Sequence, residues 1–126
     1  MKKIGFITKN KILAQSLALL IKNDLDLPFE PYVLPNLEQA AVDVEVLSID
    51  IAVVEMVTGS PKEPGMLQLC NELQNSKTKC RILLLVPQDN QHIRDLAMKA
   101  VSTKIANDYV FMDTSLDYLF AKILAL

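Results

Sequence analysis

The chain divides into short runs of apolar residues, and each run is followed by a segment in which apolar residues recur at helical spacing. One run extends from Ser48 to Met56 and is β-branched at its centre. It is followed by the turn-forming residues Gly59, Ser60 and Pro61. A run this short and this continuously apolar predicts a strand buried on both faces, as in a parallel sheet covered by helices. Glu55 then lies near the carboxyl end of the strand, at the edge where open α/β sheets usually bind ligands.

Four further apolar runs predict the other strands of this sheet. The run at residues 29–34 is flanked by prolines, which suits a strand near a sheet edge. The run at residues 82–86 is again apolar on both faces and is stopped by a proline. The first and last strands are expected at residues 3–8 and 109–112.

The segments between these runs carry apolar residues three or four positions apart, which predicts five helices. Asn10, Asn36, Asn90 and Ser115 stand where side chains cap helix N-termini, at the first, second, fourth and fifth helices. The residues expected to face the core are Ile12, Leu13, Leu17, Leu20 and Ile21; Leu37, Ala40, Ala41 and Val44; Met66, Leu69, Cys70 and Leu73; Ile93, Leu96, Ala97, Ala100 and Val101; and Leu116, Leu119, Phe120 and Ile123.

The second helix is the ambiguous element, because Val42, Val44 and Val46 also alternate as residues in a strand do. Taken as a helix, it completes a β-α pattern repeated five times with short connections. Right-handed crossovers turn such a pattern into a parallel sheet with helices on both faces. The chain is therefore expected to form one α/β domain over residues 1–126, a flavodoxin-like (βα)5 three-layer sandwich with strand order 2-1-3-4-5.

Composition and charge narrow the possible functions. Half of the residues are hydrophobic, at 51%, which is enough for a core, and the formal net charge of −2 provides no general attraction to nucleic acid or anionic membranes. No apolar run is long enough to span a bilayer. Cys70 and Cys80 do not form a CxxC pair, so they are expected to be buried, reduced thiols of a cytoplasmic protein.

Several enzyme and cofactor classes lack their residues in this sequence. The loop of residues 8–11 has neither the glycines of a dinucleotide site nor the hydroxyl-rich run of a flavodoxin phosphate loop. It also lacks the cysteine of a phosphotransferase-system IIB domain. No Ser-His-Asp set is evident, and His92, the only histidine, has no second metal ligand in view. The sequence thus predicts no catalytic residues, no metal site and no cofactor.

Two segments carry a resemblance to a known family. Residues 107–123, Asn-Asp-Tyr-Val-Phe-Met-Asp-Thr-Ser-Leu-Asp-Tyr-Leu-Phe-Ala-Lys-Ile, resemble the end of a response-regulator receiver (CheY-like) domain, with its Asp-Tyr strand and Ser-capped last helix. Residues 50–56 likewise resemble the third strand of a receiver, which ends on the aspartate that accepts a phosphoryl group. The resemblance covers the whole chain in element order and spacing, and it implies a signalling domain of two-component systems.

The resemblance places the metal and phosphate positions of a receiver on residues of other types. Two acidic residues that help to hold Mg²⁺ are expected after the first strand, and the matching positions are Thr8 and Lys9. A lysine ammonium repels a dication instead of binding it. The phosphate acceptor position is Glu55, one methylene longer than aspartate. The chain therefore resembles a pseudo-receiver, with the fold but without phosphotransfer.

The remaining receiver positions also depart from the family pattern, except for one. The hydroxyl residue that ends the fourth strand corresponds to Val86, which cannot hydrogen-bond a phosphoryl oxygen. The Lys-Pro pair corresponds to Met112 and Asp113. The aromatic residue three positions before that lysine is retained as Tyr109, for which an ordinary sheet-edge role is favoured over that of a rotamer switch.

Glu55 supports two interpretations. It is either a built-in mimic of a charged acceptor that holds the domain in one conformation, or a carboxylate left over after loss of the metal site. In both cases a partly buried carboxylate needs a partner. The sequence offers Lys9 as that partner, so a Lys9–Glu55 ion pair is predicted.

Two classes of function remain open. The favoured one is a regulatory protein-interaction module that binds a partner protein, an output domain or a second copy of itself. The resemblance implies, as in receivers that dimerise, a surface on the fourth helix, fifth strand and fifth helix, with Asp95, Lys99, Asp108, Tyr118 and Lys122. The alternative is a small-molecule or ion sensor that uses the carboxyl edge of the sheet, with Thr8, Lys9, Glu55, Asp89 and Asp113 around a pocket.

Overall fold

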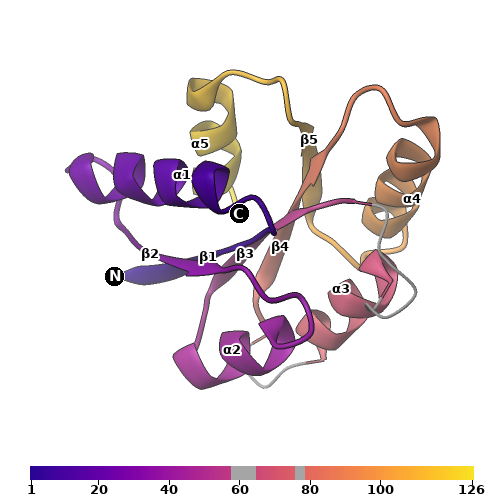
Figure 1. The fold of residues 1–126 in the computed structure, drawn as a ribbon, viewed down its shortest axis with the longest axis horizontal. Coiled ribbons are helices and arrows are strands. Elements are labelled where there is room, and N and C mark those ends of the chain that lie inside the picture. The colour runs from indigo at the N-terminus through magenta and orange to yellow at the C-terminus, as the bar shows by residue number, and fades with distance from the viewer. Residues whose placement is uncertain (58–64, 76–78) are drawn as a thin grey trace.

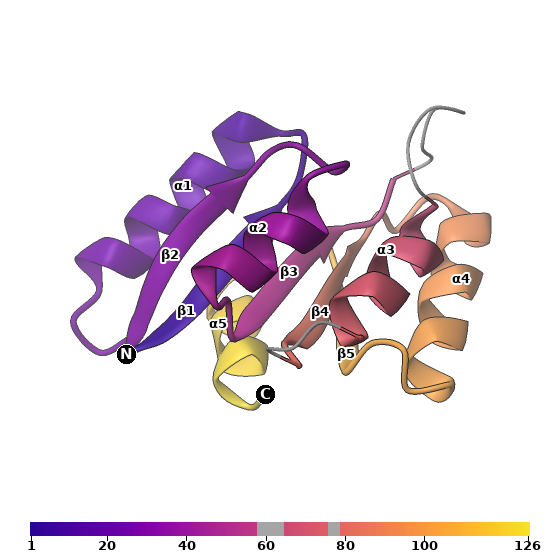
Figure 2. The ribbon, with the colours of Figure 1, turned by 90° about the horizontal axis from the view of Figure 1, so that it is seen from below.

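A computed structural model describes residues 1–57, 65–75 and 79–126. Its five strands form one parallel sheet in the order β2-β1-β3-β4-β5, as the sequence predicts. Figures 1 and 2 show α1 and α5 on one face of the sheet and α2, α3 and α4 on the other. The strands are β1 (Lys2–Ile7), β2 (Phe29–Leu34), β3 (Ile51–Glu55), β4 (Arg81–Val86) and β5 (Asp108–Phe111), and the helices are α1 (Lys11–Asn23), α2 (Ala40–Leu47), α3 (Met66–Gln74), α4 (Gln91–Ser102) and α5 (Leu116–Leu124).

The central strands are buried on both faces and divide the core in two. Successive side chains of a strand point to opposite faces, so Ile4 and Phe6 pack with Ile51 and Val53 under α1 and α5. Val54 packs with the other cluster, under α2, α3 and α4. None of the helices in the described ranges combines the length and the apolar character needed to cross a membrane.

Three of the four predicted helix caps are confirmed. The side-chain oxygens of Asn10, Asn90 and Ser115 accept hydrogen bonds from the backbone N–H three residues later, at 3.0, 3.1 and 3.2 Å. The prediction for Asn36 is wrong. Its Oδ1 accepts from the N–H of Glu38 at 3.0 Å, which closes a local turn, and α2 begins only at Ala40.

The predicted core positions are mostly confirmed, but Ile12, Leu20 and Leu116 are exposed, at 79%, 43% and 46%. In α1 the buried residues are Ala14, Leu17 and Ile21, of which Leu17 and Ile21 were predicted. At 100° per residue Ile12 lies well away from this face, on the solvent side of the helix. In α1 the sequence pattern selected the large Ile12 and Leu20 and omitted Ala14, which is fully buried. The turn predicted at residues 59–61 and the side chain of Met66 lie outside the described part of the chain.

Both cysteines are buried and reduced, at the junction of α3 with β4. The thiol of Cys80 donates to the carbonyl oxygen of Leu73, with 3.8 Å between the sulfur and the oxygen. Burial raises the pKa of Cys70 to about 12 and that of Cys80 to about 11. Since the thiolate is the reactive form, both side chains are chemically protected in the folded chain.

We therefore expect Ellman's reagent at pH 8 to label neither thiol in the folded chain, and to label both in guanidinium chloride. Relative to the ordinary pKa of 9.0, a value of about 12 lowers the thiolate fraction of Cys70 on the order of a thousandfold. The free energy of unfolding should fall as pH rises from about 9 towards 11, because the unfolded thiols ionise first. A Cys70→Ala/Cys80→Ala variant should lack this pH dependence, and rapid labelling of native protein would contradict the prediction.

Candidate functional site

The carboxyl ends of β1 and β3 meet at a hydrogen bond between Thr8 and Glu55. The Thr8 hydroxyl donates to Oε1 of Glu55 at 2.8 Å and accepts from the backbone N–H of Asn10 at 3.0 Å. Thr8 is 4% exposed, and Glu55 is half-buried at the last position of β3. Because Asn10 caps α1, the hydroxyl joins the end of β3 to the start of that helix.

The register of the sheet explains why Thr8, and not Lys9, is the partner of Glu55. β1 pairs with β3 so that Ile4 lies beside Ile51 and Phe6 beside Val53, and two further residues along each strand bring Thr8 beside Glu55. Lys9 is one position on, in the bend that follows β1, so the register does not place it beside Glu55. Among the described residues the predicted Lys9–Glu55 ion pair is not formed, and the hydroxyl of Thr8 takes its place.

The other receiver-equivalent positions serve the core or a local turn. Val86 is fully buried in the cluster under α2, α3 and α4. Tyr109 packs against the same cluster and meets Phe111 edge to face, with 5.8 Å between ring centroids. Met112 is 38% exposed at the carboxyl edge. The side-chain amide of Gln88, oriented to donate, bonds the carboxylate of Asp113.

The five residues expected around a sensor pocket do not line one hollow. A pocket of about 310 Å³ includes Glu55 and Asp89, whereas Lys9 lines a separate one of about 510 Å³ and Asp113 a third of about 320 Å³. In the described part of the chain no three His, Cys, Asp or Glu side chains gather as a metal site would need. The pocket beside Glu55 is mainly apolar and is lined by Glu55, Met56, Val57, Pro87, Asp89, Asn90, Ile93 and Met112.

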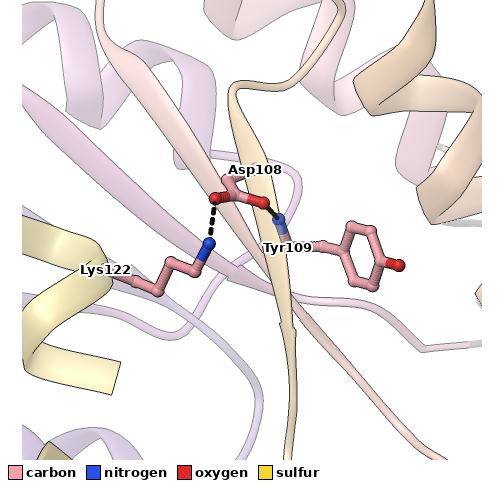
Figure 3. A network of polar contacts seen from close by, with 3 residues as sticks. All are labelled: Asp108, Tyr109 and Lys122. Carbon is pink, nitrogen blue, oxygen red and sulfur yellow. Dashed lines mark hydrogen bonds and ion pairs between the residues drawn. The ribbon is translucent and has the colours of Figure 1, made fainter. Parts of the chain in front are cut away.

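A second polar cluster joins α5 to β5, and Figure 3 shows its three central groups. Lys122 Nζ lies 2.8 Å from Oδ2 of Asp108 and 5.7 Å from the centre of the Tyr118 ring. The hydrogen bond from Lys122 to Asp108 raises the pKa of the lysine. The other oxygen of Asp108 accepts from the backbone N–H of Tyr109 at 2.8 Å. The structure thus brings together three of the five residues predicted for an interaction surface.

The two remaining residues of that predicted surface, Asp95 and Lys99, lie exposed on α4, across β5 from α5. Asp95 accepts from the side-chain amide of Gln91 at 2.7 Å. Residues of β5 and α5, together with the turn between them, border the hollow of about 320 Å³ that contains Asp108, Tyr118 and Lys122. The α4-β5-α5 side therefore presents mixed charges and the exposed ring of Tyr118. No local pattern in the sequence indicates the Asp108–Lys122 pair, because its members are fourteen residues apart.

At each edge strand of the sheet at least one backbone group is missing or already hydrogen-bonded within the chain. In β5 the carboxylate of Asp108 occupies the N–H of Tyr109, and the carbonyl of Phe111 accepts from the N–H of Thr114 at 3.1 Å. In β2, at the other edge, Pro31 has no N–H to donate. Such features are those by which natural sheets resist pairing at their edges.

The geometry predicts that Thr8→Val will destabilise the fold by about 1–2 kcal/mol, because it removes a donor to Glu55 and an acceptor for Asn10. Thr8→Ser keeps the hydroxyl and should cost less. In a double-mutant cycle measured by urea unfolding, Thr8→Val and Glu55→Gln should couple by about 0.5–1.5 kcal/mol. Additive effects of the two substitutions would show that the hydrogen bond does not contribute.

No protein-family model matches the chain, and no curated protein matches its sequence. Solved structures match its fold over nearly its full length. One is a receiver domain protein from Clostridium thermocellum, with a TM-score of 0.79, 17% identity, and coverage of 99% of this chain and 93% of that chain.

Two other matches are similar. A DNA-binding response regulator of the LuxR family from Staphylococcus aureus has a TM-score of 0.76 at 19% identity and covers 99% of this chain and 98% of its own. The receiver domain of Francisella response regulator 1452 has a TM-score of 0.77 at 15% identity, with coverage of 99% and 95%. The chain thus has the flavodoxin-like fold of response-regulator receiver (CheY-like) domains.

Proposed function

We propose that the chain is a receiver-like regulatory domain that does not accept a phosphoryl group and acts by binding protein. Its role is then that of an interaction module in signalling, possessing no catalytic activity of its own. The observation that carries the proposal is the Thr8–Glu55 hydrogen bond at the edge where receivers accept phosphate. Aspartyl phosphate chemistry needs a free carboxylate beside a metal ion, and here the carboxylate is glutamate with a hydroxyl partner.

The neighbouring positions support this proposal. Phosphoryl transfer depends on cations and hydrogen-bond donors arranged around the phosphoryl oxygens. At the matching positions this chain has Val86, which is buried in the core, and Met112, a thioether at the rim of the pocket beside Glu55. Neither side chain can neutralise a phosphoryl group or donate a hydrogen bond to one.

The α4-β5-α5 side is the surface on which we place partner binding. It combines exposed charges of both signs on α4 with Tyr118 and Lys122 on α5. Mixed charge beside an aromatic ring suits recognition of a protein surface, where aromatic side chains provide affinity and charges provide selectivity. The Asp108–Lys122 ion pair fixes the lysine in place before a partner arrives, which lowers the entropy lost on binding.

With acetyl phosphate or beryllofluoride and Mg²⁺, we expect no gain of a phosphoryl mass and no amide chemical-shift change around Glu55. The control is a variant with receiver-type residues restored: Thr8→Asp, Lys9→Asp, Glu55→Asp, Val86→Thr and Met112→Lys. If that variant folds and responds while the original chain does not, the substituted side chains are responsible. Saturable, Mg²⁺-dependent shifts in the original chain would overturn the proposal.

Charge reversal at the proposed surface should weaken partner binding and leave the fold intact. Lys99→Glu and Lys122→Glu are expected to lower the yield of partner in affinity capture, with a change of only about 0.5 kcal/mol in stability for Lys99→Glu. Lys2→Glu, an exposed lysine at the far side of the sheet, is the matched control. The double variant Asp108→Lys/Lys122→Asp keeps an ion pair between the two positions but exchanges their charges. Recovery of binding in this variant would show that partner binding depends on the ion pair and not on which position carries the positive charge. Partners captured equally by all variants would contradict the surface assignment.

A further inference from the structure

A hollow of about 390 Å³ lies at the amino ends of β1 and β2, at the edge of the sheet opposite Glu55. Figure 2 shows the N-terminus at the same end of the sheet as the connection from α1 to β2. Leu27 and Phe29 form the floor of the hollow, because both are buried and pack in the cluster under α1 and α5. Its other apolar lining residues are Met1, Leu25 and Pro31.

The walls of this hollow carry the two most exposed large apolar side chains of the described residues. Leu25 is 98% exposed and Met1 is 88% exposed. The turn that follows α1 holds Leu25 in this position. Oδ1 of Asp24 accepts from the N–H of Asp26 at 2.9 Å, and the carbonyl oxygen of Asp24 accepts from the N–H of Leu27 at 3.1 Å. Apolar side chains kept in water beside an apolar floor favour an apolar occupant.

Charged side chains of both signs complete the lining, namely Lys22, Asp24 and Glu30, and all three are exposed. The ammonium of Lys22, in the last turn of α1, bonds no other residue in the described ranges. The carboxylate of Glu30 accepts from the hydroxyl of Tyr32 at 2.7 Å, and that of Asp24 closes the turn. Each carboxylate keeps lone pairs for a further donor. The hollow thus offers one cation and two carboxylates around an apolar floor.

We propose that this hollow at the amino edge of the sheet binds a free amino acid with an apolar side chain, such as leucine or phenylalanine. The carboxylate of the ligand pairs with Lys22, and its ammonium pairs with Asp24 or Glu30. Its side chain packs against Leu27 and Phe29. A fatty acid would meet the two carboxylates and an amine would meet the lysine, whereas a zwitterion complements charges of both signs. The volume is near the lower end for small-molecule pockets, which suits a ligand of this size.

Analogues of leucine separate the three contacts. In heteronuclear NMR titrations, L-leucine should shift the amide signals of residues 24–30 with a dissociation constant below about 1 mM. L-alanine has the same charges with a smaller side chain and should bind at least about tenfold more weakly. Isocaproate lacks the ammonium and isopentylamine lacks the carboxylate, so each should bind about fivefold more weakly than leucine.

Substitutions test the residues assigned to each contact. Lys22→Met should raise the dissociation constant of leucine about fivefold without weakening the binding of isopentylamine, which has no carboxylate to pair. Its matched control is Lys11→Met, an exposed lysine at the other end of α1, which should change neither. Leu25→Ser should weaken leucine binding at least about threefold. Its control is Val46→Ser, which alters a valine that is 75% exposed on α2. Circular dichroism melting would verify that the variants are folded.

The proposal goes beyond the proposed function, because it uses neither Glu55 nor the α4-β5-α5 side. No shift of these amides at about 10 mM leucine, equal binding of alanine, or binding of isocaproate as tight as that of leucine would each overturn it. Shifts of the same amides when the chain is concentrated without ligand would assign the hollow to a second copy, which would also overturn it. The experiments with acetyl phosphate and with Lys99→Glu do not involve this hollow, so failure here is distinguishable from failure of the proposed function.

Discussion

The parallel register between β1 and β3 is the constraint on which the rest of the molecule depends. These two strands lie next to each other inside the sheet and are buried on both faces, so a shift of one strand by one residue would turn each of its buried side chains to the opposite layer. The same register brings Thr8 beside Glu55 just past the paired region. The polar contact at the carboxyl edge is thus a consequence of how the apolar interior is packed.

The fold was predictable because its signals are local and repeated. Continuous apolar runs define the strands, and Asn10, Asn90 and Ser115 mark helix starts by hydrogen bonds to residues only three positions away. The prediction that Asn36 caps a helix failed, because an asparagine that accepts from the N–H two residues later, in a turn, cannot be distinguished in sequence from one that caps a helix. Exposure of Ile12 could not be predicted either, because its size favours burial, whereas the small Ala14 is the fully buried residue of this turn.

The polar contacts of the candidate site were harder to predict. Which side chain meets Glu55 depends on strand alternation across two strands, and charge alone favoured the ammonium of Lys9 over the hydroxyl of Thr8. The Asp108–Lys122 pair likewise depends on how α5 crosses β5. Sequence reasoning identified Glu55, Thr8 and Lys122 as residues of interest, but their partners follow from tertiary packing.

The protection of both sheet edges has a consequence for the chain at high concentration. Strands of the same kind in many copies stack into cross-β fibrils when their free N–H and C=O groups pair along an axis. Pro31 removes a donor from β2, while Asp108 and Thr114 occupy groups of β5. Growth of a continuous sheet from one molecule to the next is therefore hindered at each end. Contacts made by the helical layers would use side chains, and so would not depend on these backbone groups.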